Sequence, residues 1–136
     1  MQFTAYLIFD GRCEEAFKFY QQALGGEIEA MVSAVGTPIE QQVPPERRNK
    51  ILNARLAVAG GLLMGMDAPP DRYQPPKGFY VSFEAGSVAE AERTFGALAE
   101  GGRVEMPLQQ TFWATRFAML VDRFGIPWMI NYSQAA

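Results

Sequence analysis

An internal repeat constrains the fold of this chain more than any other feature of its sequence. Moving the sequence by 75 positions places residues 11–16 on 86–91, and moving it by 76 places residues 25–29 on 101–105. Self-similarity at a fixed spacing is typical of a duplicated structural unit. We therefore predict two related modules within the 136 residues.

A proline-rich stretch separates the two halves. Module 1 is expected over about residues 1–67 and module 2 over about 79–136, joined by a linker at 68–78 that contains two Pro-Pro pairs. Proline fixes its own φ angle and donates no backbone hydrogen bond, so two such pairs favour a stiff, extended connector. Because the chain is short and 49% of its residues are hydrophobic, we expect the two modules to form a single domain.

Each half shows the same order of hydrophobic patterns. In the first half, an apolar run, a stretch with helical spacing and three extended runs occupy residues 2–9, 14–24 and about 27–35, 50–59 and 61–67. The second half repeats this order at residues 79–84, 88–100 and about 103–110, 113–121 and 126–132. The order predicts an α+β fold of two tandem βαβββ modules with mixed sheets. A single helix covers only one face of each sheet, so the other face needs a partner sheet or a second subunit.

Composition excludes several classes of function. The chain has no histidine, which is the commonest zinc ligand and the commonest general base near neutral pH. Fifteen acidic residues against 12 basic ones argue against a nucleic-acid or anionic-membrane partner. A single cysteine excludes an internal disulfide, and no stretch reads as a secretion signal or a membrane span. We expect a cytoplasmic protein.

Four sequence blocks resemble a known superfamily. They are AFKFY at 16–20, LMGMD at 63–67, QTFWA at 110–114 and DRFGIPWMIN at 122–131. With the paired βαβββ pattern, they resemble the glyoxalase / bleomycin-resistance / extradiol-dioxygenase superfamily, also called vicinal oxygen chelate. Within it the chain is similar to the PhnB-like group, often labelled 3-demethylubiquinone-9 3-methyltransferase domain proteins. The resemblance implies sheets that are cupped around a ligand, and a homodimer.

The resemblance also implies where a metal ion would be held. Metal-dependent members bind a divalent ion with His, Glu or Gln on the first and last strands of each module. In this sequence those positions are occupied by Ala5, Tyr80, Met64 or Met66, and Met129. Alanine has no donor atom, and a thioether is too soft for Zn²⁺, Mn²⁺, Mg²⁺ or Fe²⁺. We predict that the protein uses no metal and no other cofactor.

Activities that the PhnB-like group owes to two histidines are not expected in this chain. Members often have a histidine at the position of Asn53 and another near Thr115, and both are absent here. The glycine pairs at 60–61 and 101–102 do not form a nucleotide-binding loop that follows a strand. The methyltransferase label therefore has no support in the sequence.

Two arginines are the first candidate ligand-binding groups. An offset of 61 places Arg55 on Arg116, which suggests equivalent positions on inner strands. Two guanidinium groups that face one cavity could bind a carboxylate or a phosphate. The alternative is that each arginine pairs with a nearby acidic side chain at the sheet rim.

Aromatic and methionine side chains are the second candidate. An aromatic wall for a planar ligand could be formed by Tyr6, Tyr80, Phe112, Trp113 and Trp128. An adaptable apolar pocket could be formed by Met64, Met66, Met119 and Met129. The alternative for both sets is ordinary core packing.

The remaining candidates are isolated polar groups. Asp67 and Glu84 end strands and could act as acid or base, or cap the adjacent turns in contact with solvent. Cys13 lies in the first helical turn, where it could be a reactive thiol or a small core residue. Residues 46–49 are expected to form a solvated loop, with a flap over the cup as one option.

The sequence leaves two functions open. The first is a metal-free protein that binds a small organic ligand in a dimeric pocket. This ligand is partly aromatic, and whether it also carries an anionic group is left open. The second is an enzyme of the same superfamily, of lyase, isomerase or transferase type, that uses Tyr80, Asp67 or Arg116 either without a metal or with a metal held loosely through added water. A structural dimer with a filled cup is a third option. The predicted pocket residues are Tyr6, Asn53, Arg55, Met64, Asp67, Tyr80, Trp113, Arg116, Met129 and Asn131.

Overall fold

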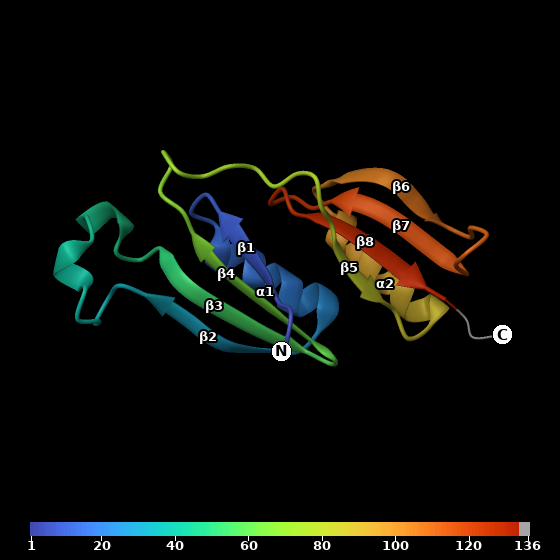
Figure 1. Cartoon of the computed structure of the whole chain (residues 1–136), viewed down its shortest axis with the longest axis horizontal. Coiled ribbons are helices and arrows are strands. Elements are labelled where there is room, and N and C mark those ends of the chain that lie inside the picture. The colour runs from blue at the N-terminus through green and yellow to red at the C-terminus, as the bar shows by residue number, and fades with distance from the viewer. Residues whose placement is uncertain (134–136) are drawn as a thin grey trace. The chain divides into compact units, whose positions relative to one another are not determined.

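The computed structural model describes residues 1–133 and divides into two compact units after Gln74. We call these units module 1 and module 2 (Figure 1). Module 1 contains β1 (Ala5–Phe9), α1 (Cys13–Leu24), β2 (Glu27–Ser33), the short 3₁₀ helices η1 (Glu40–Gln42) and η2 (Pro45–Arg47), β3 (Ile51–Val58) and β4 (Gly61–Asp67). Module 2 contains β5 (Val81–Glu84), α2 (Val88–Ala99), β6 (Arg103–Gln109), β7 (Arg116–Val121) and β8 (Pro127–Tyr132).

The two modules have the same sheet topology. The strand order is β1-β4-β3-β2 in module 1 and β5-β8-β7-β6 in module 2. The first strand of each module runs parallel to the last, and the other neighbours are antiparallel. This confirms the predicted α+β fold of two βαβββ modules with mixed sheets. That the two modules form one domain stays a prediction.

Three predicted strands and the predicted linker differ from the structure. Residues 2–4 and 79–80 precede the strands that were expected to include them. Residues 113–115 form a loop before β7, because the Ala114 N–H donates to Thr111 Oγ1 at 3.1 Å and the Ala114 carbonyl accepts from the Thr111 N–H. The linker is also not fully extended, since the Pro69 carbonyl accepts from the backbone of Arg72 and Tyr73 in a turn.

The core of module 1 forms where α1 packs on its sheet. Ala16, Phe17 and Tyr20 recur at helical spacing on α1 and are fully buried. The rings of Phe9 and Phe17 meet edge to face with centroids 6.1 Å apart. A Cβ at Gly65 would lie 2.7 Å from Phe17 Cε1, so a glycine on β4 is what permits this close approach.

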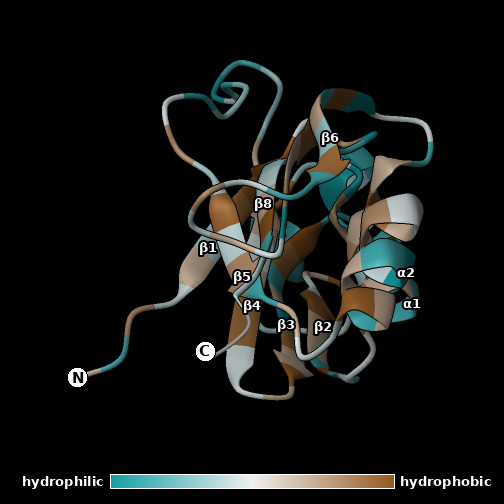
Figure 2. Ribbon diagram, turned by 90° about the vertical axis from the view of Figure 1, so that its right-hand side faces the viewer, coloured by the Kyte–Doolittle hydropathy of each residue, from teal (hydrophilic) through white to brown (hydrophobic). Residues whose placement is uncertain are grey.

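The core of module 2 is built around α2 and the buried indole of β8. The side chain of Ser87 caps α2 by accepting a hydrogen bond from the Glu90 N–H at 3.0 Å. Leu98 on α2 is fully buried, and Trp128 on β8 is 1% exposed. The Trp128 Nε1–H donates to Asp122 Oδ2 at 2.9 Å, which satisfies the buried indole. Figure 2 shows mainly apolar residues along the strands and alternating hydrophilic and apolar residues on the helices.

Each sheet has a helix side and a second side, which we call the open face. In module 1, α1 contacts β2, β3 and β4, and in module 2, α2 contacts β6, β7 and β8. Alternate residues of a strand point to opposite faces. On β4, Leu63, Gly65 and Asp67 are buried on the helix side, whereas Met64 and Met66 are partly exposed on the open face.

Candidate functional site

The open face of module 2 carries a row of methionines. The register pairs Ser82 with Met129, Met129 with Met119, and Met119 with Met106, so four neighbouring strands contribute one residue each. Directly opposed residues have Cβ atoms about 5 Å apart. The three thioethers therefore form a continuous, polarizable apolar floor, and each methionine remains partly exposed.

A tyrosine–glutamate pair lies at one end of this floor. The Tyr80 hydroxyl, just before β5, donates to Glu105 Oε1 on β6 at 2.6 Å. The pair joins the two edge strands of the sheet, which in a flat sheet lie about 14 Å apart. The hydrogen bond to Glu105 raises the pKa of Tyr80, so the hydroxyl keeps its proton. Arg103 Nη2 lies 3.5 Å from Glu105 Oε2 and balances the carboxylate charge.

Aromatic rings lie at the other end. Phe117 on β7 pairs in register with Asn131 on β8, in the row beside the methionines. The ring of Trp113 meets Phe117 edge to face with centroids 5.3 Å apart, and Phe112 meets Trp113 at 4.7 Å. Trp113 is 50% exposed, so its indole is accessible from solvent.

The same row contains a polar network. Asn131 Nδ2 donates to Glu84 Oε2 and, at 2.8 Å, to Ser133 Oγ. The Ser133 N–H donates to Glu84 Oε1 at 2.7 Å. These bonds hold the Glu84 carboxylate in a fixed orientation beside the methionine floor. The solvated position predicted for Glu84 agrees with its exposure.

The open face of module 1 also carries polar side chains. Tyr6, Met64 and Arg55 follow each other across β1, β4 and β3. The Tyr6 hydroxyl donates to Asn53 Oδ1 at 3.3 Å, and Arg55 Nε donates to Glu29 Oε1 at 2.8 Å. Arg55 therefore pairs with a nearby acidic residue, as one of the two predicted alternatives had it.

The predicted equivalence of Arg55 and Arg116 in the repeat is wrong. The buried pairs Leu56–Leu63 and Leu120–Trp128 occupy matching rows on the helix sides of the two sheets. Leu56 therefore corresponds to Leu120, and the equivalent of Arg55 is the preceding residue, Met119. Arg116 lies on the helix side of β7, and its Nη1 donates to its neighbour's carbonyl at 2.8 Å.

Asp67 is a structural carboxylate and not a pocket residue. It is 5% exposed and lies on the helix side of β4. Its Oδ1 accepts from the N–H groups of Gly11 at 3.0 Å and Cys13 at 2.9 Å, and its Oδ2 accepts from the Ile51 N–H at 2.8 Å. The prediction of an acid or base at Asp67 is wrong, and the cap interpretation is correct except that the cap is buried.

Two further candidates belong to the core. Cys13 is fully buried, and burial, followed by the nearby charges of Asp67 and Glu14, raises the pKa of its thiol strongly. A thiol that stays protonated is a poor nucleophile, so the small core residue is the correct alternative. Trp128 is buried on the helix side of β8 and takes no part in an aromatic wall on the open face.

The donor atoms of the described residues do not fit a divalent metal ion. Ala5 lies on the helix side of β1, so the resemblance places that ligand position on the wrong face. The open-face residues of the first and last strands are Tyr6, Ile8, Leu62, Met64, Met66, Ser82, Glu84, Pro127, Met129 and Asn131. Glu84 is their only carboxylate, and residues 1–133 contain no group of three His, Cys, Asp or Glu that could hold a metal.

The loop at 46–49 is fastened by hydrogen bonds at the end of module 1. Arg47 Nη2 donates to the Ala68 carbonyl at 3.2 Å, and Lys50 Nζ donates to the Gly11 carbonyl at 3.2 Å. Gly11 and Ala68 follow β1 and β4, so these contacts hold the loop to the connections of the sheet. They give no support to a mobile flap.

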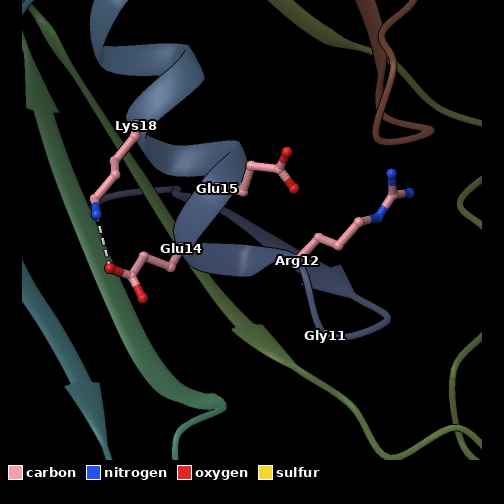
Figure 3. Close-up of a pocket in the computed structure, with 5 residues that line it drawn as sticks. All are labelled: Gly11, Arg12, Glu14, Glu15 and Lys18. Atoms are coloured by element: carbon pink, nitrogen blue, oxygen red, sulfur yellow. Dashed lines mark hydrogen bonds and ion pairs between the residues drawn. The ribbon is translucent and has the colours of Figure 1, made fainter.

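A hollow of about 360 Å³ lies on the solvent side of α1. Figure 3 shows Lys18 paired with Glu14 along the helix and the Arg12 side chain directed away from both. All three side chains are exposed. The hollow is a surface feature of α1 and does not include any predicted pocket residue.

The predicted pocket residues therefore lie in three places: the open face of module 2, the open face of module 1 and the helix sides of the sheets. Tyr80, Trp113, Met129 and Asn131 belong to module 2, and Tyr6, Asn53, Arg55 and Met64 belong to module 1. Glu29, Glu105, Met106 and Phe117 were not predicted. Acidic residues in otherwise apolar strands were the available signal for Glu29 and Glu105.

Comparisons with known proteins agree with this architecture. The sequence pattern of the Glyoxalase/Bleomycin resistance protein/Dioxygenase superfamily matches residues 2–130. Protein YjdN of Escherichia coli strain K12 is 36% identical over 142 residues, which cover 96% of this chain and 95% of YjdN.

Two solved structures are also similar. Protein PA1353 from Pseudomonas aeruginosa is 48% identical with a TM-score of 0.90, and the match covers 99% of each chain. A PhnB protein from Bacillus cereus is 24% identical with a TM-score of 0.75, covering 98% of this chain and all of the other. The second likeness shows the fold alone. Among the described residues, no helix is long and apolar enough to cross a membrane.

Proposed function

We propose that this chain, which belongs to the Glyoxalase/Bleomycin resistance protein/Dioxygenase superfamily, binds a small organic ligand on the open face of module 2 without a metal ion. The observation that carries the proposal is the row of Met129, Met119 and Met106 between the Tyr80–Glu105 pair and the Phe117–Trp113 rings.

This arrangement has the chemistry of a binding site for a partly aromatic molecule. Methionine side chains are flexible and polarizable, so a methionine floor adapts to the shape of an apolar ligand. Trp113 offers an exposed aromatic ring that can make stacked or edge-to-face contacts with a planar ligand. Tyr80 and Asn131 supply a few positioned polar groups, as small-molecule sites typically do.

A thermal-shift experiment with matched variants tests the proposal. Benzyl alcohol serves as a neutral aromatic probe, and Mn²⁺, Zn²⁺, Ni²⁺ and Fe²⁺ serve as metal probes. We expect benzyl alcohol to raise the Tm of the wild type, and Met129→Gln to remove that increase. Met64→Gln, at the matching position of module 1, should retain it. A stoichiometric metal that raises the Tm, or equal effects of both variants, contradicts the proposal.

We further propose that the protein is a homodimer of the reducing cytoplasm, with more than about 1,500 Å² buried in total. The support is a set of large apolar side chains left exposed within the single chain, among them Phe112 at 96% and Phe79 at 47%. Light scattering coupled to gel filtration should give about twice the chain mass of 15.1 kDa. The mass of one chain at micromolar concentration contradicts the proposal.

The Tyr80–Glu105 pair favours a second candidate function, catalysis of a proton transfer in a lyase or isomerase type of reaction. Glu105 would accept a proton from a carbon beside a carbonyl. The protonated Glu105 would then no longer need the hydrogen bond from Tyr80, whose O–H would turn to donate to the enolate oxygen. In D₂O, proton NMR should then show deuterium entering hydroxyacetone, and Glu105→Gln should abolish the exchange. Exchange no faster than in buffer rules this candidate out for that substrate class.

A further inference from the structure

The open faces of the two modules differ in charge at matching positions. Arg55 of module 1 is replaced by Met119 in module 2, which removes a basic group. In the adjacent row, Ile8 of module 1 is replaced by Glu84, which adds an acidic group. The repeated fold therefore presents an anionic group only in module 2 at this position.

The Glu84 carboxylate is held in position but has no ion-pair partner among residues 1–133. Asn131 Nδ2 and the Ser133 N–H, which are both neutral donors, hold its two oxygens. Within residues 1–133, the ion pairs involve other carboxylates. Neutral donors supply no positive charge, so a cationic ligand would be the ion-pair partner of this carboxylate.

The other charged groups of this face do not compensate Glu84. Glu105 pairs with Arg103, so those two charges cancel. Arg116 lies on the helix side of β7 and donates to a backbone carbonyl. Counted over the described residues, two carboxylates and one guanidinium leave this open face with one uncompensated negative charge.

The neighbours of Glu84 suit the apolar part of a cation. Met129 lies in the adjacent row of the sheet, and Phe117 pairs with Asn131 across the same row. Trp113 extends the aromatic surface toward solvent. Ammonium groups are attracted by aromatic rings as well as by carboxylates, so the two features act in the same direction.

We infer that the ligand of module 2 is an organic cation, an ammonium group attached to an aromatic or aliphatic body, with the ammonium near Glu84 and the body on the methionine floor. This inference rests on the proposed function. The expected charge of the ligand is therefore opposite to the one that the two arginines suggested. Those arginines are not equivalent, because Arg55 lies on the open face of β3 and Arg116 on the helix side of β7.

Three probes of similar size separate charge from shape. Benzylammonium is cationic, benzyl alcohol is neutral and benzoate is anionic. The emission of Trp113, obtained as the difference between the wild type and Trp113→Phe, reports binding. Glu84→Gln removes the charge and keeps the shape, and Glu92→Gln, an exposed residue of α2, is the matched control.

We expect the cation to bind best and the anion worst. Glu84→Gln should weaken the cation about two- to fivefold, as for a partly exposed ion pair, and leave benzyl alcohol unchanged. Glu92→Gln should change neither affinity. If benzyl alcohol binds as well as the cation and Glu84→Gln has no effect, the cation inference is wrong and the ligand site stands. If none of the probes changes the Trp113 emission, both the inference and the proposed function fail.

Discussion

Replacing Asp67 by asparagine tests the structural role assigned to this buried carboxylate. The asparagine keeps one oxygen, which can still accept from Gly11 and Cys13. Its amide NH₂ then faces the Ile51 N–H, which in the native structure lies 2.8 Å from Oδ2. One hydrogen bond to a charged acceptor is lost and a buried donor is left without a partner, which costs about 2–4 kcal/mol.

Urea unfolding followed by far-UV circular dichroism measures this loss. With a urea slope of about 1.5 kcal/mol per M, the midpoint should fall by about 1–3 M. Asp71→Asn makes the same change of charge on an exposed side chain of the linker and should cost less than about 0.5 kcal/mol. If Asp67→Asn unfolds at the same midpoint as Asp71→Asn, the three hydrogen bonds do not have the role assigned to them.

Three further substitutions or modifications test the packing of the modules. Gly65→Ala should lower the free energy of unfolding in urea by about 1–3 kcal/mol, because its Cβ would lie 2.7 Å from a buried phenylalanine ring. Gly61→Ala on the same strand places its Cβ in open space and should leave that free energy unchanged. In the native protein, Cys13 should react slowly with iodoacetamide at pH 8–9, because its raised pKa keeps the thiol protonated. In urea, it should react at the rate of a free thiol. Rapid labelling of the native protein, measured by mass spectrometry, would contradict its burial. Asp122→Asn should lower stability by about 2–4 kcal/mol and change the emission of Trp128, whose Nε1–H it accepts; an unchanged spectrum and midpoint argue against that contact.

The element order was predictable because local signals agree with each other. The helical spacing of residues 14–24 and the following glycine pair mark α1 and its end, and the same pattern marks α2. The repeat then fixed the βαβββ order without knowledge of any long-range contact. The predicted fold class is therefore confirmed.

The faces of the strands were harder to predict, because a small error in alignment reverses them. The offset of 61 that matched two arginines differs by three from the offset of 64 that relates Leu56 to Leu120. An odd difference moves a residue to the other side of the sheet, which is why Arg116 lies on the helix side and Arg55 on the open face.

Contacts between distant segments could not be predicted from the sequence. Asp67 ends a strand, and only the folded module brings its carboxylate to the first turn of α1. Glu105 lies where the register between β6 and β7 shifts, between Val104 and Met106, so its orientation depends on a local irregularity. The Tyr80–Glu105 pair could not have been found from strand alternation alone.

The most direct measurement of ligand binding on the open face of module 2 is methyl NMR with ¹³C-labelled methionine, titrated with benzyl alcohol. The two modules provide the internal comparison, since Met119 and Met129 line the proposed site and Met64 and Met66 line the open face of module 1. We predict saturable shifts of the Met119 and Met129 methyl signals, with those of Met64 and Met66 unchanged. Shifts confined to Met64 and Met66, or no saturable shift of any methionine, would contradict a ligand site on module 2.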